Sequence, residues 1–415
     1  MSFQQGLSGL NAASRNLEVI GNNVSNSNTI GFKESTAQFA DVFASSINGA
    51  GNSLIGTGTQ VSGIAQSFAQ GNISVSENPL DLAINGKGFF KVRNGQGDEI
   101  YTRNGQFSLN GQGYLVNSSG SKVLGYTFDD KTKTVIDKVI PIQLPQRPIP
   151  PKGTGTGILE LNLDARKKAP TAAFDVTDLT SYNDTTSMAI YDQLGGSHTV
   201  SYYFRRDPDV SAGVMANSWK VYATVDGAAV GNGPFGTLQF DNNGLASNGS
   251  STILTLPVAG MQAGSSSFVD NIELDMTSST QYGSAFQVNN LDQNGYASGD
   301  LTGVLIAPDG RVTARYTNGQ SQDLAKVGLF GFRNPEALRP VGSNGWVLTE
   351  AAGAEYTPAN DGSGFGVIQS GALEEANMDL TAQLVDMITA QRVYQANAQT
   401  IKTQDSILQT LVNLR

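Results

Sequence analysis

Apolar residues recur in alternating steps of three and four residues at both ends of the chain. At the N-terminal end the positions are Phe3, Leu7, Leu10, Ser14, Leu17, Gly21 and Val24. At the C-terminal end they are Leu380, Leu384, Met387, Gln391, Tyr394, Ala398, Ile401, Asp405, Leu408, Val412 and Arg415. These steps place the apolar residues on one face of a helix, and such a face is stable in water when other helices cover it. The pattern therefore predicts two terminal helices that need helical partners.

The first helix is expected over residues 1–27, where Ser2 and Gln5 fit a capping pattern. It contains glycines at three positions, each of which costs about 1 kcal/mol relative to alanine inside a helix. We therefore expect this helix to become ordered only when a neighbouring helix packs against it. The glycines are Gly6, Gly9 and Gly21.

The second helix is expected over residues 372–415, because neither proline nor glycine interrupts this stretch. Glu374, Glu375 and Asp379 would lie in its first turns, where negative charge complements the helix dipole. The first helix is too short to cover the second, so an apolar stripe would stay exposed even if the two helices pair. Exposed stripes of this kind are typical of interfaces.

We predict that the apolar members of both series form an interface through which copies of the chain polymerise. Head-to-tail contacts that do not close into a ring give a helical polymer. The predicted interface residues are Phe3, Leu7, Leu10, Leu17, Val24, Leu380, Leu384, Met387, Tyr394, Ala398, Ile401, Leu408 and Val412.

Between the helices the pattern changes to short strands. Residues 187–191, 198–204 and 219–225 show the clearest strand pattern. Asn-Gly and Asp-Gly pairs, which tolerate the positive φ angles of hairpin turns, separate many of the apolar runs. These pairs are Asn85-Gly86, Asn94-Gly95, Asn110-Gly111, Asp309-Gly310, Asn318-Gly319 and Asn344-Gly345.

The order of these patterns predicts a multidomain α+β protein. It has a terminal α-helical coiled-coil domain made from both chain ends, and two nested mainly-β domains. A proline cluster from Pro141 to Pro151 marks the boundary between the β domains. The expected segments are 1–30 (N-terminal helix of the core), 31–71 (extended connector), 72–145 (inner β domain), 146–283 (inserted outer β domain), 284–358 (inner β domain, continued), 359–371 (connector) and 372–415 (C-terminal helix of the core).

Composition excludes several classes of function. The formal net charge of −10 and the pI near 4.7 argue against a nucleic-acid partner. The absence of cysteine excludes disulfides, thiolate metal sites and cysteine nucleophiles. No apolar run approaches the roughly 20 residues of a membrane span, so membrane insertion is not expected, and no run of signal-peptide length follows Met1.

Candidate catalytic or cofactor-binding motifs are weak. Residues 231–236 match the letters of a dinucleotide-binding loop, but they contain Pro234 and lead into a strand-like run. His198 is the only histidine, which excludes a metal site with two histidines, and its place at the start of a strand favours a structural role. We therefore expect no cofactor, no metal and no enzymatic activity.

Several runs of residues resemble signatures of the bacterial flagellar rod and hook family. Residues 21–33 read GNNVSNSNTIGFK, which is similar to the family's N-terminal signature. Residues 78–90, NPLDLAINGKGFF, and residues 101–105, YTRNG, resemble the start of the family's shared β domain. The C-terminal helix, with AQRVYQANA at 390–398 and a closing NLR, resembles its C-terminal signature. Residues 146–283 carry no such signature.

This resemblance implies a structural protein of the flagellum that is exported without a cleaved signal peptide. Within the family, rod proteins lack a large insertion and hook subunits carry one, so the insertion favours the hook type. The resemblance then implies a curved extracellular tube that acts as a universal joint between motor and filament, with a central export channel. The implied partners are further copies of the chain, the distal rod protein, the hook cap, the hook–filament junction proteins and the flagellar type III export apparatus. A rod-type protein is the alternative within the family, and a β-rich extracellular enzyme or adhesin is the alternative outside it.

Overall fold

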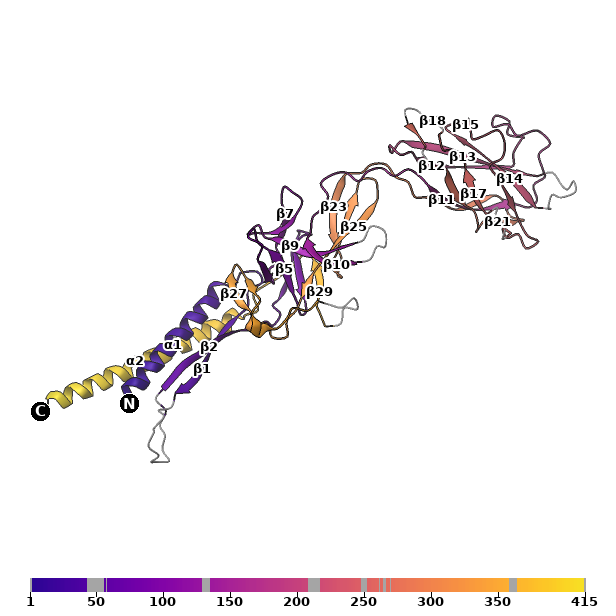
Figure 1. The fold of residues 1–415 in the computed structure, drawn as a ribbon. Coiled ribbons are helices and arrows are strands. Elements are labelled where there is room, and N and C mark those ends of the chain that lie inside the picture. The colour runs from indigo at the N-terminus through magenta and orange to yellow at the C-terminus, as the bar shows by residue number, and fades with distance from the viewer. Residues whose placement is uncertain are drawn as a thin grey trace. The chain divides into compact units, whose positions relative to one another are not determined.

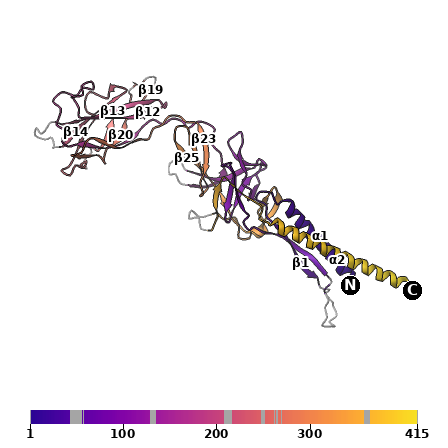
Figure 2. The same ribbon diagram turned by 180° about the vertical axis from the view of Figure 1, so that it is seen from behind.

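The backbone forms two compact units (Figure 1, and from behind in Figure 2). The computed structural model describes residues 2–42, 56, 58–128, 135–207, 217–247, 252–260, 262–263, 266–268, 270–357 and 364–413. Unit 1 consists of Met1–Gln146, Gly303–Arg315 and Ser321–Arg415, and unit 2 consists of Arg147–Thr302 and Tyr316–Gln320. Among the described residues, no helix is long and apolar enough to cross a membrane.

Unit 1 contains both terminal helices, which lie against each other (Figure 1). Helix α1 spans Ser2–Ser25, and helix α2 spans Leu380–Asn413. Two terminal helices in contact, attached to a mostly β protein, were expected from the apolar pattern, and the structure confirms this coarse architecture.

Helix α2 begins at Leu380 rather than at Ala372. Residues Ala372–Glu374 form strand β30, which pairs with strand β3 (Ile73–Val75). Asp379 precedes the helix, and its carboxylate accepts hydrogen bonds from the backbone N–H groups of Thr381 and Ala382, at 2.8 and 3.3 Å. This cap satisfies donors that the first turn leaves unpaired, and it explains where the helix starts. The expected place of Glu374 in the first turn is therefore corrected to a strand.

Residues 31–71, expected as an extended connector, contain a β-hairpin. Strand β1 (Ser35–Val42) pairs antiparallel with strand β2 (Gly58–Gln66), and both strands contact α1. Neither strand contains a buried residue, so the sequence shows no clear alternation of apolar and polar positions there.

The inner β region of unit 1 is built around a sheet with twelve strands in the described part of the chain. Its longest path has the order β23-β24-β25-β9-β5-β6-β28-β27, and β7, β8, β10 and β26 pair at its sides. The bounds are β5 Phe89–Arg93, β6 Glu99–Thr102, β7 Phe107–Leu109, β8 Leu115–Asn117, β9 Lys122–Phe128, β10 Val135–Pro141, β23 Leu301–Ile306, β24 Arg311–Tyr316, β25 Ser321–Val327, β26 Leu329–Phe330, β27 Arg339–Gly342 and β28 Gly345–Val347. Strands β4 (Leu82–Asn85) and β29 (Val367–Ser370) form a separate pair, and two short 3₁₀ helices span Pro335–Ala337 and Glu350–Ala352.

Several turns of this sheet occur at the predicted Asn-Gly and Asp-Gly pairs. Gly310 joins β23 to β24 with φ +86°, and Gly319 joins β24 to β25 with φ +78°. Between β27 and β28 the positive φ angles belong to Ser343 and Asn344, at 52° and 53°. Two adjacent residues with positive φ match the right-handed twist of the strands that they connect.

Unit 2 has two five-stranded sheets and a small hairpin in its described part. One sheet has the order β17-β20-β11-β21 with β22 also on β11, and the other has the order β12-β13-β14-β15 with β16 on β14. The bounds are β11 Thr156–Asp164, β12 Asp184–Tyr191, β13 Ser197–Arg206, β14 Ser218–Val225, β15 Ala228–Ala229, β16 Gly236–Gln239, β17 Ile253–Leu256, β18 Gln262–Ala263, β19 Ser266–Ser267, β20 Ile272–Asp275, β21 Thr280–Tyr282 and β22 Gln287–Gln293. The strands expected at 187–191, 198–204 and 219–225 are confirmed as parts of β12, β13 and β14.

Two expected segment boundaries differ from the structure. Strand β22 lies after residue 284, the expected return to the inner domain, yet it pairs with β11 of unit 2. In the expected connector 359–371, residues 367–370 form β29, and residues 359–363 lie outside the described part. In both cases a strand pairs with a partner far away in the sequence, which a local pattern does not reveal.

His198 of unit 2 is held between two carboxylates. Its Nδ1 atom lies 2.7 Å from Oδ2 of Asp226, and its Nε2 atom lies 3.2 Å from Oδ2 of Asp192. Burial lowers the pKa of His198, but the hydrogen bonds and charges of the two aspartates outweigh burial and hold this pKa above its usual value. His198 therefore has the structural role that its position favours.

Unit 2 should lose stability relative to a His198→Gln variant as the pH rises through the pKa of folded His198. A histidine whose pKa is raised by folding stabilises the protein fully below its unfolded pKa of about 6.5, and this contribution disappears as the proton is lost. Chemical denaturation between pH 5.5 and 8.5, followed by Trp219 fluorescence in a Trp346→Phe background, measures the difference. An equal difference between wild type and variant across this range would contradict the role of the charged imidazole.

Candidate assembly interface

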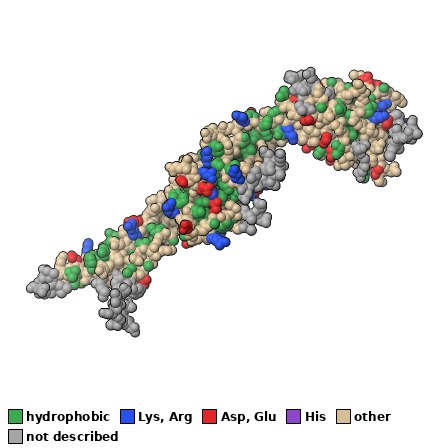
Figure 3. Space-filling view, in the orientation of Figure 1, with side chains coloured by type: hydrophobic (Ala, Val, Ile, Leu, Met, Phe, Trp, Pro, Cys, Tyr) green, Lys and Arg blue, Asp and Glu red, His purple; other side chains and the backbone are tan. Residues whose placement is uncertain are grey.

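The predicted interface residues are exposed or partly exposed in the single chain. Among those with described side chains none is buried, and the exposed fractions of Phe3, Leu384 and Leu408 are 45%, 44% and 49%. Figure 3 shows hydrophobic side chains on the surface of the helical end of unit 1. The exposed members are Phe3, Leu7, Leu380, Leu384, Tyr394 and Leu408, and the partly exposed ones are Leu10, Leu17, Val24, Met387, Ala398 and Ile401. The side chain of Val412 lies outside the described part.

Contacts between the two helices include small and polar residues that lie outside the predicted stripe. A Cβ atom built on Gly6 would lie 3.1 Å from Cγ1 of Ile401, and one on Gly9 would lie 2.8 Å from Oδ1 of Asn397. At the other end, Nδ2 of Asn23 donates a hydrogen bond to Oε1 of Gln383 at 3.2 Å. The helices are therefore antiparallel, and two of the glycines that weaken α1, Gly6 and Gly9, allow α2 to approach closely, whereas Gly21 has no neighbouring atom within 4 Å of its Cβ position. Of the predicted interface residues, Ile401 is thus placed against α1.

The β1–β2 hairpin is fastened to α1 at two places. Near the end of α1, Asn23 exchanges hydrogen bonds with the backbone of Ser35, donating to its carbonyl at 2.8 Å and accepting from its N–H at 3.0 Å. Near the start of α1, Nε2 of Gln5 donates to the carbonyl of Gly56 at 2.7 Å. There too, the N–H of Thr59 donates to Oγ of Ser8 at 3.3 Å. At both places the hairpin is held to the helix by polar groups.

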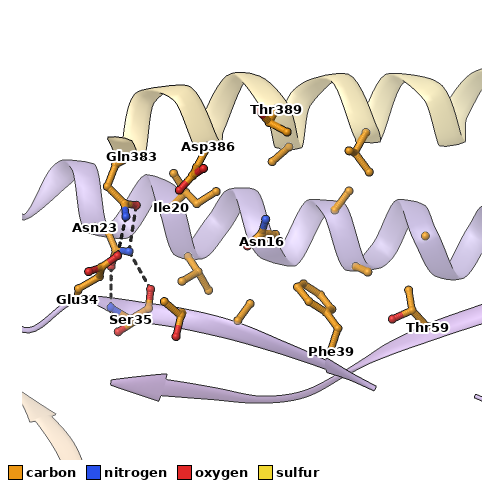
Figure 4. Close-up of a pocket in the computed structure, with 18 of the residues that line it drawn as sticks. Asn16, Ile20, Asn23, Glu34, Ser35, Phe39, Thr59, Gln383, Asp386 and Thr389 are labelled. Carbon is orange, nitrogen blue, oxygen red and sulfur yellow. Dashed lines mark hydrogen bonds between the residues drawn. The ribbon is translucent and has the colours of Figure 1, made fainter. Parts of the chain in front are cut away.

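A groove with both apolar and polar lining lies between these two places, bounded by α1, α2 and the hairpin (Figure 4). Its volume is about 570 Å³. The groove, named here the helix–hairpin groove, is lined on its apolar side by Ala12, Ala13, Val19, Ile20, Ala37 and Phe39. Its polar lining includes Asn16, Glu34, Asp386 and Thr389. Small side chains on both walls keep the groove open, and it could receive several side chains of a partner.

A buried ionic cluster joins three distant parts of unit 1. The Nζ atom of Lys33 lies 2.8 Å from Oε1 of Glu374, and Nη1 of Arg103 lies 3.1 Å from Oε2. The side chains of Lys33 and Glu374 are fully buried, and burial lowers the pKa of both Lys33 and Arg103, against the opposing effect of Glu374. Lys33 also donates to the carbonyl of Ala69, and Glu374 accepts from the N–H of Gly71.

The sequence patterns did not reveal this cluster, although they single out all three of its members, and Glu374 was expected in the first turn of α2 instead. Lys33 closes the N-terminal signature run, and Arg103 lies in the YTRNG run. The cluster links the chain between α1 and β1, the segment after β6, and strand β30 before α2. It therefore fixes where the chain enters and leaves the helical end of unit 1.

Profiles of four flagellar protein families match successive parts of the chain. Residues 3–33 match the flagella basal body rod protein family, and residues 83–162 match the flagellar hook protein FlgE/F/G D1 domain. Residues 162–296 match the flagellar basal body protein FlaE D2 domain. Residues 369–414 match the flagellar basal body rod FlgEFG protein C-terminal family.

Whole-chain relatives agree with these matches. The flagellar hook protein FlgE of Salmonella typhimurium is 39% identical over 424 residues, and that of Escherichia coli K12 is 38% identical; each alignment covers 100% of both chains. The flagellar hook protein FlgE of Borreliella burgdorferi is 30% identical, over 100% of this chain and 99% of the relative. These full-length matches decide between the hook and rod alternatives in favour of the hook.

A solved structure supports the fold. The crystal structure of Helicobacter pylori flagellar hook protein FlgE2 superposes with a TM-score of 0.55 at 15% identity, over 72% of this chain and 100% of that one. At this identity the likeness concerns the fold alone. The resemblance of the sequence signatures to the rod and hook family is confirmed by the relatives. The chain belongs to the flagellar hook protein FlgE family and is a structural subunit of the bacterial flagellar hook.

Proposed function

We propose that copies of this chain polymerise into the curved hook tube through the predicted apolar stripes of α1 and α2. One observation supports this most directly: the helices pair within the chain, yet the predicted stripe residues remain exposed or partly exposed. Each exposed leucine of the stripes is about half exposed, so covering it contributes roughly 1 kcal/mol to association. In the polymer, the stripes pack in coiled-coil fashion against the helices of several neighbours.

The remaining features of this function rest on family membership. The tube encloses a central channel and lies outside the cell. It acts as a universal joint that transmits torque from the motor to the filament. The subunit passes through the flagellar type III export apparatus without cleavage of a signal peptide. In the assembled flagellum it contacts the distal rod protein, the hook cap and the hook–filament junction proteins.

The double variant Leu380→Ser/Leu384→Ser should abolish tube formation at concentrations where the wild type assembles. Both side chains are exposed, at 46% and 44%, so the folded monomer loses little. The critical concentration should rise by at least about tenfold, because 1.4 kcal/mol already corresponds to a factor of ten. Sedimentation and electron microscopy of polymer grown from purified protein measure this change.

The matched control is Gln395→Ser/Gln399→Ser, which alters two exposed polar residues at the same spacing on the same helix. This control should assemble like the wild type. Normal tubes from the leucine variant would show that the stripe does not drive polymerisation.

A further inference from the structure

We propose that the helix–hairpin groove binds the C-terminal end of α2 from a neighbouring copy of this chain. This inference rests on the proposed self-assembly and specifies one of its contacts. It assigns a donor segment and an acceptor site to different parts of unit 1.

The donor segment is the part of α2 that extends beyond α1. In the antiparallel pair Gly6 lies opposite Ile401, so Ser2, four residues earlier, lies level with Asp405, four residues later. Residues 405–413 therefore continue past the first described residue of α1. Figure 1 shows this end of α2 reaching beyond the N-terminus.

The donor segment is amphipathic. Ile407 and Leu408 are exposed by 47% and 49%. The sequence has a second apolar pair four residues later, Leu411 and Val412, and this spacing is typical of one face of an amphipathic helix. Asp405 is the only charged residue from 405 to 413. This segment can therefore enter an apolar site at a small cost in desolvated charge.

The acceptor site matches this segment in chemistry. The apolar part of the groove wall consists of alanine, valine, isoleucine and phenylalanine side chains, with Asn16, Glu34, Asp386 and Thr389 among the polar residues beside it. Phe39 on the hairpin is still 43% exposed. The groove lies between the Asn23–Ser35 and Ser8–Thr59 contacts, alongside the paired part of α2. The extended end of the same α2 lies beyond the start of α1, and α2 is one continuous helix. The extended end of α2 cannot fold back into the groove of its own chain. In the proposed contact, the segment that binds in the groove therefore belongs to another copy.

A donor and an acceptor at different places make a heterologous contact. Such contacts are not self-complementary, and repetition of one produces an open helical array rather than a closed dimer. This is the geometry that a tube requires. The contact also covers the apolar end of α2, which α1 leaves uncovered in the single chain.

Cysteine crosslinking tests the contact cleanly because the chain contains no cysteine. The variant Phe39→Cys/Leu408→Cys carries one thiol on the groove wall and one on the donor segment, both at exposed positions. Treatment of the assembled polymer with a short bis-maleimide should give a ladder of dimers, trimers and longer chains. The control pair Phe39→Cys/Gln395→Cys should give no ladder, because Gln395 lies outside the donor segment.

A second variant keeps the inference testable if the thiol pair impairs assembly. Ala37→Phe fills the groove from β1 and should lower the assembled fraction at least tenfold, while circular dichroism and the melting temperature of the monomer stay as in the wild type. Gln38→Phe places the same ring at the next position of the strand, outside the groove lining, and should assemble normally.

The outcomes separate this inference from the proposed function. Normal assembly of Ala37→Phe, or crosslinker-treated polymer without a ladder, overturns the groove contact while tube formation through the stripes stands. Equal loss of assembly in Ala37→Phe and Gln38→Phe also overturns it. Normal tubes from Leu380→Ser/Leu384→Ser would instead contradict the proposed function.

Discussion

Replacing Glu374 with glutamine should lower the free energy of unfolding of unit 1 by about 3–5 kcal/mol, the usual cost of removing one partner from a buried ion pair. Glutamine preserves the shape of the side chain but leaves Lys33 and Arg103 buried without a counter-ion. In the native protein the Glu374 carboxylate contacts both cations, at 2.8 and 3.1 Å. The loss is large because neither cation can reach water without opening the junction that the cluster closes.

Fluorescence can measure this loss in unit 1 alone. The chain has two tryptophans, Trp346 in unit 1 and Trp219 in unit 2. Nε1 of Trp346 donates a hydrogen bond to Gln66 at 2.7 Å, so its emission reports on the β2 end as well as on the inner sheet. Denaturation of Glu374→Gln in a Trp219→Phe background should show the shift.

The neighbouring variant Glu375→Gln is the matched control for Glu374→Gln. Glu375 is only partly buried and accepts a hydrogen bond from Asn72 at 3.2 Å, so its replacement should cost less than about 1 kcal/mol. Equal effects of the two variants would contradict the special role of the buried cluster.

The deficit of Glu374→Gln should shrink as the pH is raised from 7 towards 10. Burial already lowers the pKa of Lys33, and Glu374 opposes that shift. Without Glu374 the pKa of Lys33 falls further, so the range of pH in which the unfolded chain binds more protons than the folded one becomes wider in the variant than in the wild type. Stability then rises with pH until the lysine of the unfolded chain also loses its proton, near pH 10.4.

The Glu374 cluster also shows why the start of α2 was not predictable from local sequence. Nothing in the residues from Ala372 onward disfavours a helix, and the acidic residues suit a first turn. Glu374 is instead held in β30 by Lys33, which is 341 residues away in the sequence. A tertiary ion pair and strand pairing override local helix propensity here.

The heptad pattern predicted the two helices but not the faces through which they meet. The pattern selects large apolar residues, whereas the contact within the chain uses Gly6, Gly9 and Asn23. Small residues carry little hydrophobic signal, yet they permit the closest approach of two backbones. The assignment of the apolar stripe to contacts between copies stays a prediction, as does the coiled-coil packing.

In unit 2, local signals predicted strands but not their sheets. The runs that became β12, β13 and β14 are consecutive and antiparallel, so neighbours in sequence are neighbours in space. Strand β11 pairs in parallel with β20 and β21 and antiparallel with β22, all more than a hundred residues later. Such pairings depend on the folding of the intervening chain, which explains the misplaced boundary at 284.

Replacing Trp219 with alanine should destabilise unit 2 by about 3–5 kcal/mol, the cost of emptying a large core site. Trp219 is fully buried on β14, in the cluster that contains Tyr202 and Phe204 of β13 and Leu274 of β20. Since small domains are stable by only about 5–15 kcal/mol, this loss removes a large part of the stability of unit 2. Calorimetry should show a lower unfolding temperature for unit 2 in the variant than in the wild type.

The same Trp219→Ala variant separates assembly from the integrity of unit 2. Both stripes and the helix–hairpin groove belong to unit 1, whose core clusters contain no residue of unit 2 among the described residues. Trp346 emission should therefore keep its wild-type unfolding midpoint, and the variant should still polymerise at a temperature where its unit 2 is unfolded and unit 1 remains folded. If polymerisation is lost while the Trp346 transition is unchanged, the main assembly contacts lie in unit 2 rather than in unit 1. If tubes still form, the main assembly contacts lie in unit 1, where the exposed apolar stripes are.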